Sequence, residues 1–162
     1  MKWLSPDSAF MRGWNNLADA VWINMLMLVT SIPIVTIGAA LAAGHDACRR
    51  SQSGEGKVTT NYFKAFKSNF VKATLIWLPY LLVLAGLSYA WLVLQITPLL
   101  IPKFAFSILW IVSFEWVFAL QARFENSVGR TIINSFIFGI AHIGMTIVLV
   151  LIDAVFLGII VG

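Results

Sequence analysis

Long apolar stretches separated by short charged linkers dominate the pattern along this chain. No Asp, Glu, Lys or Arg occurs in 20–44, 73–102 or 131–152, and 104–122 contains one charged residue, Glu115. About 20 apolar residues are enough for a helix to cross the hydrocarbon core of a bilayer. The pattern therefore predicts membrane-spanning helices.

The positions of these stretches predict the arrangement of the spans. We expect spans near 17–44, 73–96, 104–122 and 131–152, followed by an incomplete segment at 154–162. As a helix, the last segment would rise only ~14 Å, which is too short to cross alone. Helices are required because each backbone polar group must find its partner within its own segment. We therefore predict an all-α, polytopic membrane helical bundle of four to five spans, forming a single membrane domain over residues 1–162.

The first predicted span is interrupted by Pro33. It is longer than one crossing needs, and a proline removes a backbone donor and disfavours helix at the preceding residue, Ile32. Two arrangements fit: a single kinked crossing, or a re-entrant hairpin with its tip near Pro33. On length we favour the kinked crossing.

Composition supports the membrane class. Hydrophobic residues make up 60% of the chain and charged residues 11%, whereas soluble domains carry about 25% charged residues. So few polar residues would not cover the outside of a water-soluble domain of this size. The chain has one cysteine, Cys48, which excludes an internal disulfide.

The basic residues predict which linkers face the cytoplasm. The net charge is +4, and most basic residues lie between 45 and 72: Arg49, Arg50, Lys57, Lys64, Lys67 and Lys72. Cytoplasmic loops carry an excess of Lys and Arg. Both 45–72 and 123–130 are therefore expected in the cytoplasm, while the side of the N-terminus stays open. Because the basic residues flank the spans, we expect contact with lipid and none with nucleic acid.

Two segments have the pattern of interfacial amphipathic helices. In the first, Phe10, Trp14, Leu17 and Val21 share one helical face, as in a helix that lies at the membrane interface. In 59–72, aromatic and basic positions alternate, and a second linker adds charges where the third span ends. The predicted contacts with lipid or a partner protein are Phe63, Lys64, Phe66, Lys67, Phe70, Lys72, Arg123 and Glu125.

Polar groups inside the spans are the candidates for chemistry. An ionisable side chain in a span is costly unless it is paired, which makes it a functional candidate. Glu115 and His142 are such groups, and Asn134 is a further polar residue on the fourth span. They predict either a site for a proton or polar substrate, or a structural hydrogen bond between helices.

Other short features predict packing and exclude several kinds of site. Gly38, Ala42 and Gly44 belong to pairs of small residues four apart, a spacing that allows helices to approach closely. His45, Asp46 and Cys48 offer three ligand types on one segment, which falls short of a four-ligand structural metal site. We expect no metal, no cofactor and no enzymatic activity, since no nucleophile–base pair or cofactor fingerprint is visible.

A series of motifs resembles the YesL family of bacterial integral membrane proteins, which are filed as a domain of unknown function. The motifs are Ser5-Pro6-Asp7 with Met11-Arg12, the run from Ser31 to Ala40, the run from Asn61 to Phe70 with Ala73-Thr74 and Trp77, and Ala122 to Asn126. They cover nearly the whole chain in the expected order. The resemblance implies a bacterial plasma-membrane location and, through neighbouring genes, a link to carbohydrate uptake by ATP-binding-cassette (ABC) transporters. It implies no catalytic or binding residues.

Two functions follow as expectations. The first is an accessory or assembly partner of ABC-type sugar transport subunits, with 59–72 and 123–130 as cytoplasmic contact surfaces. The alternative is a small transporter or channel that forms a homo-oligomer and uses a polar path at Glu115 and His142.

Overall fold

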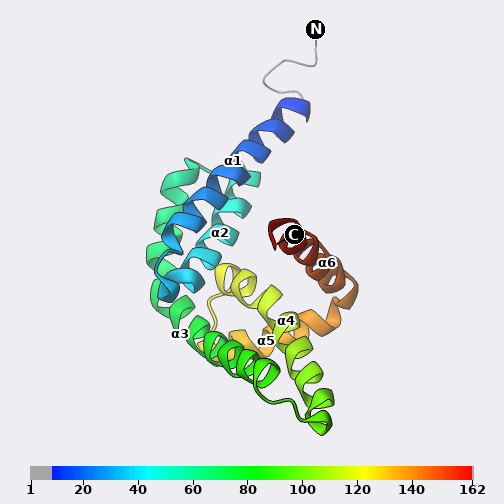
Figure 1. The fold of residues 1–162 in the computed structure, drawn as a ribbon. Helices are drawn as coiled ribbons and strands as arrows, with labels where there is room; N and C mark the ends of the chain where they lie inside the picture. Colours follow the sequence, from blue (N-terminus) through cyan, green and yellow to red (C-terminus); the bar gives the residue numbers. More distant parts are fainter. Residues whose placement is uncertain (1–8, 162) are drawn as a thin grey trace. The chain divides into compact units, whose positions relative to one another are not determined.

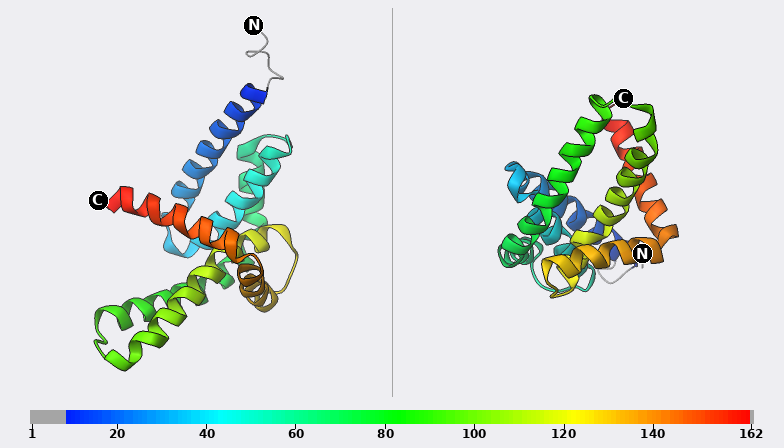
Figure 2. Two further views of the ribbon diagram at one scale, coloured as in Figure 1. Left: turned by 90° about the vertical axis from the view of Figure 1, so that its right-hand side faces the viewer. Right: turned by 90° about the horizontal axis from the view of Figure 1, so that it is seen from below.

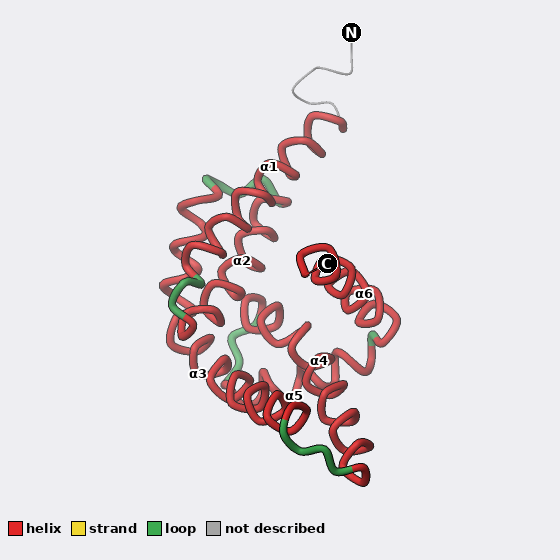
Figure 3. Tube along the Cα trace, viewed as in Figure 1, coloured by secondary structure: helices red, strands yellow, loops and turns green. Residues whose placement is uncertain are grey.

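The computed structural model describes residues 9–161, in which helices are joined by short turns and no strand occurs (Figure 1). The helices are α1 (Ala9–Thr30), α2 (Ile37–Gln52), α3 (Val58–Leu92), α4 (Leu100–Arg123), α5 (Val128–Ala141) and α6 (Ile143–Val161). Two short 3-10 turns, η2 (Ile34–Thr36) and η3 (Thr97–Leu99), precede α2 and α4 (Figure 3). The predicted all-α class is confirmed.

The chain forms two compact units where the sequence predicts one membrane domain. The first unit comprises residues 1–74 and the second residues 75–162. Helix α3 belongs to both units, since its residues to Thr74 pack with α1 and α2 and its later residues pack with α4 and α5. Each unit has its own set of packed helices and is described separately below.

In the first unit, α1 and α2 form an antiparallel hairpin (Figures 1 and 2). Asp19 of α1 meets Ser51 of α2 near one end of the pair, and Met27 lies against Gly44 farther along it. The favoured single kinked crossing over 17–44 is therefore not what the structure shows. The chain turns back at Pro33, because this residue cannot continue the hydrogen-bond ladder of α1.

Small residues allow α2 to pack closely inside the first unit. Gly38, Ala42 and Gly44 are all buried, and so are four further alanines of the helix. A β-carbon on Gly44 would overlap the thioether of Met27. The core of the unit adds Ile23 from α1 and Tyr62 from α3, both almost fully buried. The small-residue spacing noted in the sequence thus lies at the contact between helices of one chain.

Helix α3 joins two segments that the sequence treats separately. The expected interfacial segment 59–72 and the expected span 73–96 form one helix of 35 residues, which ends at Leu92. Pro79 lies inside this helix. A proline in an apolar helix is tolerated where neighbouring groups replace the lost backbone bond or where local geometry adjusts.

In the second unit, the expected fourth span is broken. Residues 131–152 divide between α5 and α6, whose axes differ by 97° across His142. The expected incomplete segment 154–162 is not separate, since α6 runs through it to Val161. The break is stabilised locally: the amide of His142 donates to Phe138, and the hydroxyl of Thr146 donates to the carbonyl of Gly139 (3.0 Å).

Two helices of the described chain are long and apolar enough to cross a membrane, or three if the bent α5–α6 pair counts as one span. The two are α3 and the 97–123 segment that contains α4. The sequence predicts four to five spans. Helix α2 has only 16 residues, which rise ~24 Å and fall short of the ~30 Å hydrocarbon core. These helices establish that the protein associates with a membrane.

We expect Gly139→Ala to destabilise the second unit. A β-carbon there would overlap the side chain of Val112 and lie 3.0 Å from its backbone oxygen, which has little freedom to move. Overpacking of this kind costs about 1–3 kcal/mol, which thermal unfolding in detergent would detect. Gly86→Ala is the control, because nothing lies within 4 Å of its new β-carbon. Equal melting temperatures for the two variants would contradict the close packing.

Candidate functional site

A buried cluster of three hydroxyl groups joins the helices of the second unit. Tyr80 of α3 is hydrogen-bonded to Ser113 of α4 and lies 3.3 Å from the hydroxyl of Ser135 of α5. Ser113 and Ser135 are themselves 2.5 Å apart, and Ser135 also donates to the carbonyl of Ile132 (2.6 Å). Each hydroxyl therefore has its partners within the cluster or on the adjacent backbone, so the cluster holds helices together.

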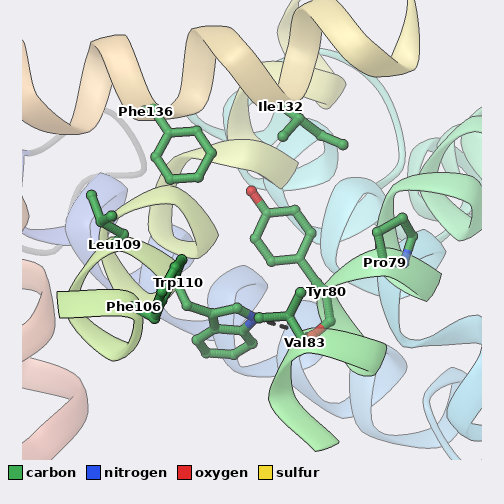
Figure 4. A pocket seen from close by; sticks show the side chains of 8 residues that line it. All are labelled: Pro79, Tyr80, Val83, Phe106, Leu109, Trp110, Ile132 and Phe136. Carbon is green, nitrogen blue, oxygen red and sulfur yellow. Dashed lines mark hydrogen bonds between the residues drawn. The ribbon is translucent and has the colours of Figure 1, made fainter. Parts of the chain in front are cut away.

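An apolar cavity of about 260 Å³ lies beside this cluster (Figure 4). Its lining comes from α3, α4 and α5: Pro79, Tyr80, Val83, Phe106, Leu109, Trp110, Ile132 and Phe136. The indole nitrogen of Trp110 donates to the carbonyl of Tyr80 (3.0 Å), and the Tyr80 hydroxyl is engaged with the two serines. The polar groups that line the cavity are thus already hydrogen-bonded within the protein. The cavity therefore suits a hydrocarbon group better than a sugar, which needs free donors and acceptors.

Trp116 links α4 to the break between α5 and α6. Its indole nitrogen donates to the hydroxyl of Thr146 (2.9 Å), which is almost fully buried. His142 lies at the break itself, where its ring stacks on Phe138 with a centroid distance of 5.4 Å and lies 5.8 Å from the ring of Trp116. His142 is exposed, and its Nδ1 is 3.2 Å from the carbonyl oxygen of Phe138.

Glu115 pairs with a residue that the sequence analysis did not select. Its carboxyl group lies next to that of Asp153 on α6. In the described part of the chain no contact joins Glu115 to His142, and half-buried Asn134 makes no hydrogen bond.

Lys103 is a buried cation near the start of α4. Its ammonium group donates to the carbonyl of Leu94, just beyond the end of α3, and lies 5.6 Å from the ring centroid of Trp91. The indole of Trp91 in turn donates to Ser107 (3.1 Å). These bonds fix the connection between α3 and α4.

Charged groups of the first unit gather where α2 ends. Asp46 is buried and accepts hydrogen bonds from Arg49 (2.7 Å) and Arg50 (2.8 Å), and Arg50 also reaches Glu55 at 3.6 Å. Burial and the charge of Asp19 raise the pKa of the Cys48 thiol, which disfavours the thiolate that a metal would need. Asp46 is likewise committed to the two arginines.

The basic-aromatic stretch of α3 divides between a buried and an exposed face. Phe66 is half-buried and stacks on Tyr62 (6.3 Å between centroids), facing the core of the unit. The other predicted contact residues of this stretch are exposed: Phe63, Lys64, Lys67, Phe70 and Lys72. These lysines and phenylalanines are therefore open to contact along the first four turns of α3.

The other predicted contact residues are also exposed: Arg123 is the last residue of α4, and Glu125 lies just beyond the helix. The guanidinium of Arg123 lies 5.7 Å from the ring centroid of Phe124. The side chain of Phe10, which the sequence places on an amphipathic face, lies outside the described part of the chain.

The sequence did not single out four buried hydroxyl residues, because they carry no formal charge. They are Tyr80, Ser113, Ser135 and Thr146. A usable signal was present, since Ser and Thr in apolar helices are enriched where helices meet. The sequence does not indicate which of these hydroxyl groups form hydrogen bonds with one another. Asp153 was treated as the end of a span, although it carries the partner carboxyl of Glu115.

We expect Tyr80→Phe to lower the stability of the second unit by about 1 kcal/mol, as interhelical hydrogen bonds in membrane proteins typically contribute. Ser113 and Ser135 retain their bond to each other, which limits the loss. Thermal unfolding in detergent measures the effect. Tyr89→Phe is the matched control, because Tyr89 is 59% exposed. A loss of the same size in the control would show that the buried hydroxyl has no special role.

Comparison with known proteins supports the family and does not assign an activity. Residues 20–91 match the family described as "Protein of unknown function, DUF624". The comparisons find no match among curated proteins or among solved structures. The matched segment covers the second half of α1, all of α2 and nearly all of α3. The predicted resemblance to the YesL family is thereby confirmed as a resemblance: residues 20–91 are similar to DUF624, the type of segment that YesL proteins contain.

Proposed function

We propose that this protein is a non-enzymatic accessory or assembly subunit for carbohydrate uptake by an ABC-type transporter in a bacterial plasma membrane. The link to carbohydrate uptake rests on the resemblance to the YesL family. In this proposal the linkers 45–72 and 123–130 face the cytoplasm, because most basic residues lie in them.

The observation that carries an accessory role is an exposed apolar stripe along the middle of α1. Trp14, Leu17, Val21 and Met25 are each 55–61% exposed and share one face of the helix. Exposed apolar patches of this kind mark protein or membrane contacts. An amphipathic helix with apolar anchors at this spacing fits an apolar groove on a partner protein.

The apolar lining of the cavity in the second unit favours an accessory role over direct binding of a sugar. Recognition of a sugar needs several free donors and acceptors, and those lining this cavity are already bonded within the protein. A subunit that contacts a transporter, and leaves sugar recognition to it, needs no such groups.

Affinity purification from native membranes tests this proposal. We expect tagged protein to recover transporter subunits, and the double variant Leu17→Glu with Val21→Glu to lose them, because two charges would interrupt the stripe. Asn16→Glu is the control, since Asn16 is exposed on another face of the same helix. Recovery of no transporter subunit with the unaltered chain would overturn the proposal.

A small oligomeric transporter or channel is the second candidate, and the Glu115–Asp153 pair is the observation that favours it. Two neighbouring carboxyl groups within apolar helices are the kind of groups found along ion and proton pathways.

Under this second function, Glu115→Gln retains the fold and loses flux. The amide keeps a polar side chain of the same size next to Asp153 but cannot take up or release a proton, so proton flux in liposomes would fall about tenfold or more while the melting temperature stays unchanged. Asn134→Ala is the control, because Asn134 is a polar residue of the same unit outside the pair. Purified protein that shows no flux above empty liposomes would exclude this function.

A further inference from the structure

The turn between α1 and α2 presents a wholly apolar tip. Ile32 is 77% exposed, Leu28 72% and Val29 63%. Ile34 and Val35 complete the tip and are also more than half exposed. No charged residue occurs anywhere from 20 to 44. In water such a tip would be a conspicuous exposed apolar patch.

The two threonine hydroxyls of this turn find their partners within the protein. The hydroxyl of Thr36 donates to the carbonyl of Thr30 (2.5 Å) and reaches that of Pro33 (2.7 Å). The hydroxyl of Thr30 donates to Leu26 (2.9 Å) and pairs with the hydroxyl of Tyr62 (2.6 Å). Irregular backbone at membrane depth requires this kind of internal partner. These bonds therefore suit the turn to contact with lipid.

The turn lies at the end of the first unit through which α3 leaves. Trp22 of α1 bonds to Thr59 of α3 (2.9 Å), and Thr30 of α1 bonds to Tyr62, so α1 and α3 run in the same direction. Tyr62 is therefore close to the start of the turn, and Lys67 follows it by five residues of α3, a rise of ~7.5 Å toward the end at which the turn lies.

The sequence of α3 places the membrane at this same end. After Lys72 the helix continues without a charged residue to Leu92 and passes the length and composition requirements for a membrane span. The chain therefore enters the hydrocarbon just beyond the lysines. Exposed Lys64, Lys67 and Lys72 are then positioned at the level of the lipid headgroups, where each lysine is attracted to an anionic surface.

We propose that the apolar turn 28–35 inserts into the leaflet that α3 enters, and that Lys64, Lys67 and Lys72 bind the anionic phospholipid headgroups of that leaflet. The charge of the three lysines selects an anionic bilayer surface as the partner. The charged end of the hairpin, where Asp46 holds Arg49 and Arg50, then lies away from the membrane. This inference does not depend on the proposed function, because it concerns lipid alone.

Fluorescent labels on single cysteines test the insertion in vesicles of phosphatidylglycerol and phosphatidylcholine. In a Cys48→Ala background, a label at Ile34→Cys reports on the turn and one at Ser53→Cys on the opposite, exposed end of α2. We expect spin-labelled acyl chains to quench the label at position 34 strongly and that at position 53 weakly. A water-soluble thiol reagent should react about tenfold more slowly at position 34, because lipid limits its access.

Equal quenching and equal reactivity at the two positions would overturn the insertion. So would disulfide cross-linking of two chains through Ile34→Cys in place of lipid quenching, because a second copy would then cover the turn. Thermal unfolding of both labelled variants checks that each is folded. Thr36→Val supplies an independent variant, since loss of its hydroxyl opens the turn and is expected to weaken the quenching at position 34.

A second label tests the lysines. Val71 is 67% exposed between Lys67 and Lys72, and a label at Val71→Cys should be quenched about twofold more by spin-labelled phosphatidylglycerol than by spin-labelled phosphatidylcholine. Replacing all three lysines by Gln should abolish this preference, whereas Lys57→Gln at the start of α3 should leave it unchanged. Equal quenching by both lipids in the unaltered chain would overturn the role of the lysines.

Discussion

Every backbone polar group exposed by a break in an apolar helix must find a partner inside the protein, and the structure depends on how this is done. At the α1–α2 turn the hydroxyls of Thr30 and Thr36 bond to nearby carbonyls. At the α5–α6 break the hydroxyl of Thr146 accepts from Trp116 and donates to Gly139. Because a hydroxyl both donates and accepts, one short side chain supports the turn and connects it to another helix.

Close approach of helix backbones is the second condition, and it depends on a few small residues. Lipid tails are as apolar as the helices, so burial of apolar surface gives little reason for helices to associate in a bilayer. Packing and interhelical bonds must supply the stability instead. Gly44 against Met27 and Gly139 against Val112 provide the packing in the two units. Tyr80, Ser113 and Ser135 add the bonds next to one of these contacts.

The two units use charge differently. In the first unit the charges are on the surface or in ion pairs, with Asp46 held between two arginines and lysines exposed along α3. In the second unit the carboxyls of Glu115 and Asp153 lie next to each other, and buried Lys103 donates to a backbone carbonyl. The first unit also exposes apolar side chains at the α1–α2 turn and along one face of α1.

The sequence alone determined the membrane class and the helical form, because apolar length and composition are properties of single segments, and its motifs carried the resemblance to a family. It also indicated that Pro33 interrupts the first apolar stretch. Whether the chain bent slightly there or folded back was decided by packing, since the alanine and glycine face of α2 needs α1 beside it. Likewise, no periodicity reveals the break at His142, which exists because Thr146 and Trp116 meet there. The partner of Glu115 required the tertiary structure as well, since Asp153 is distant in sequence and adjacent only after α6 turns back toward α4.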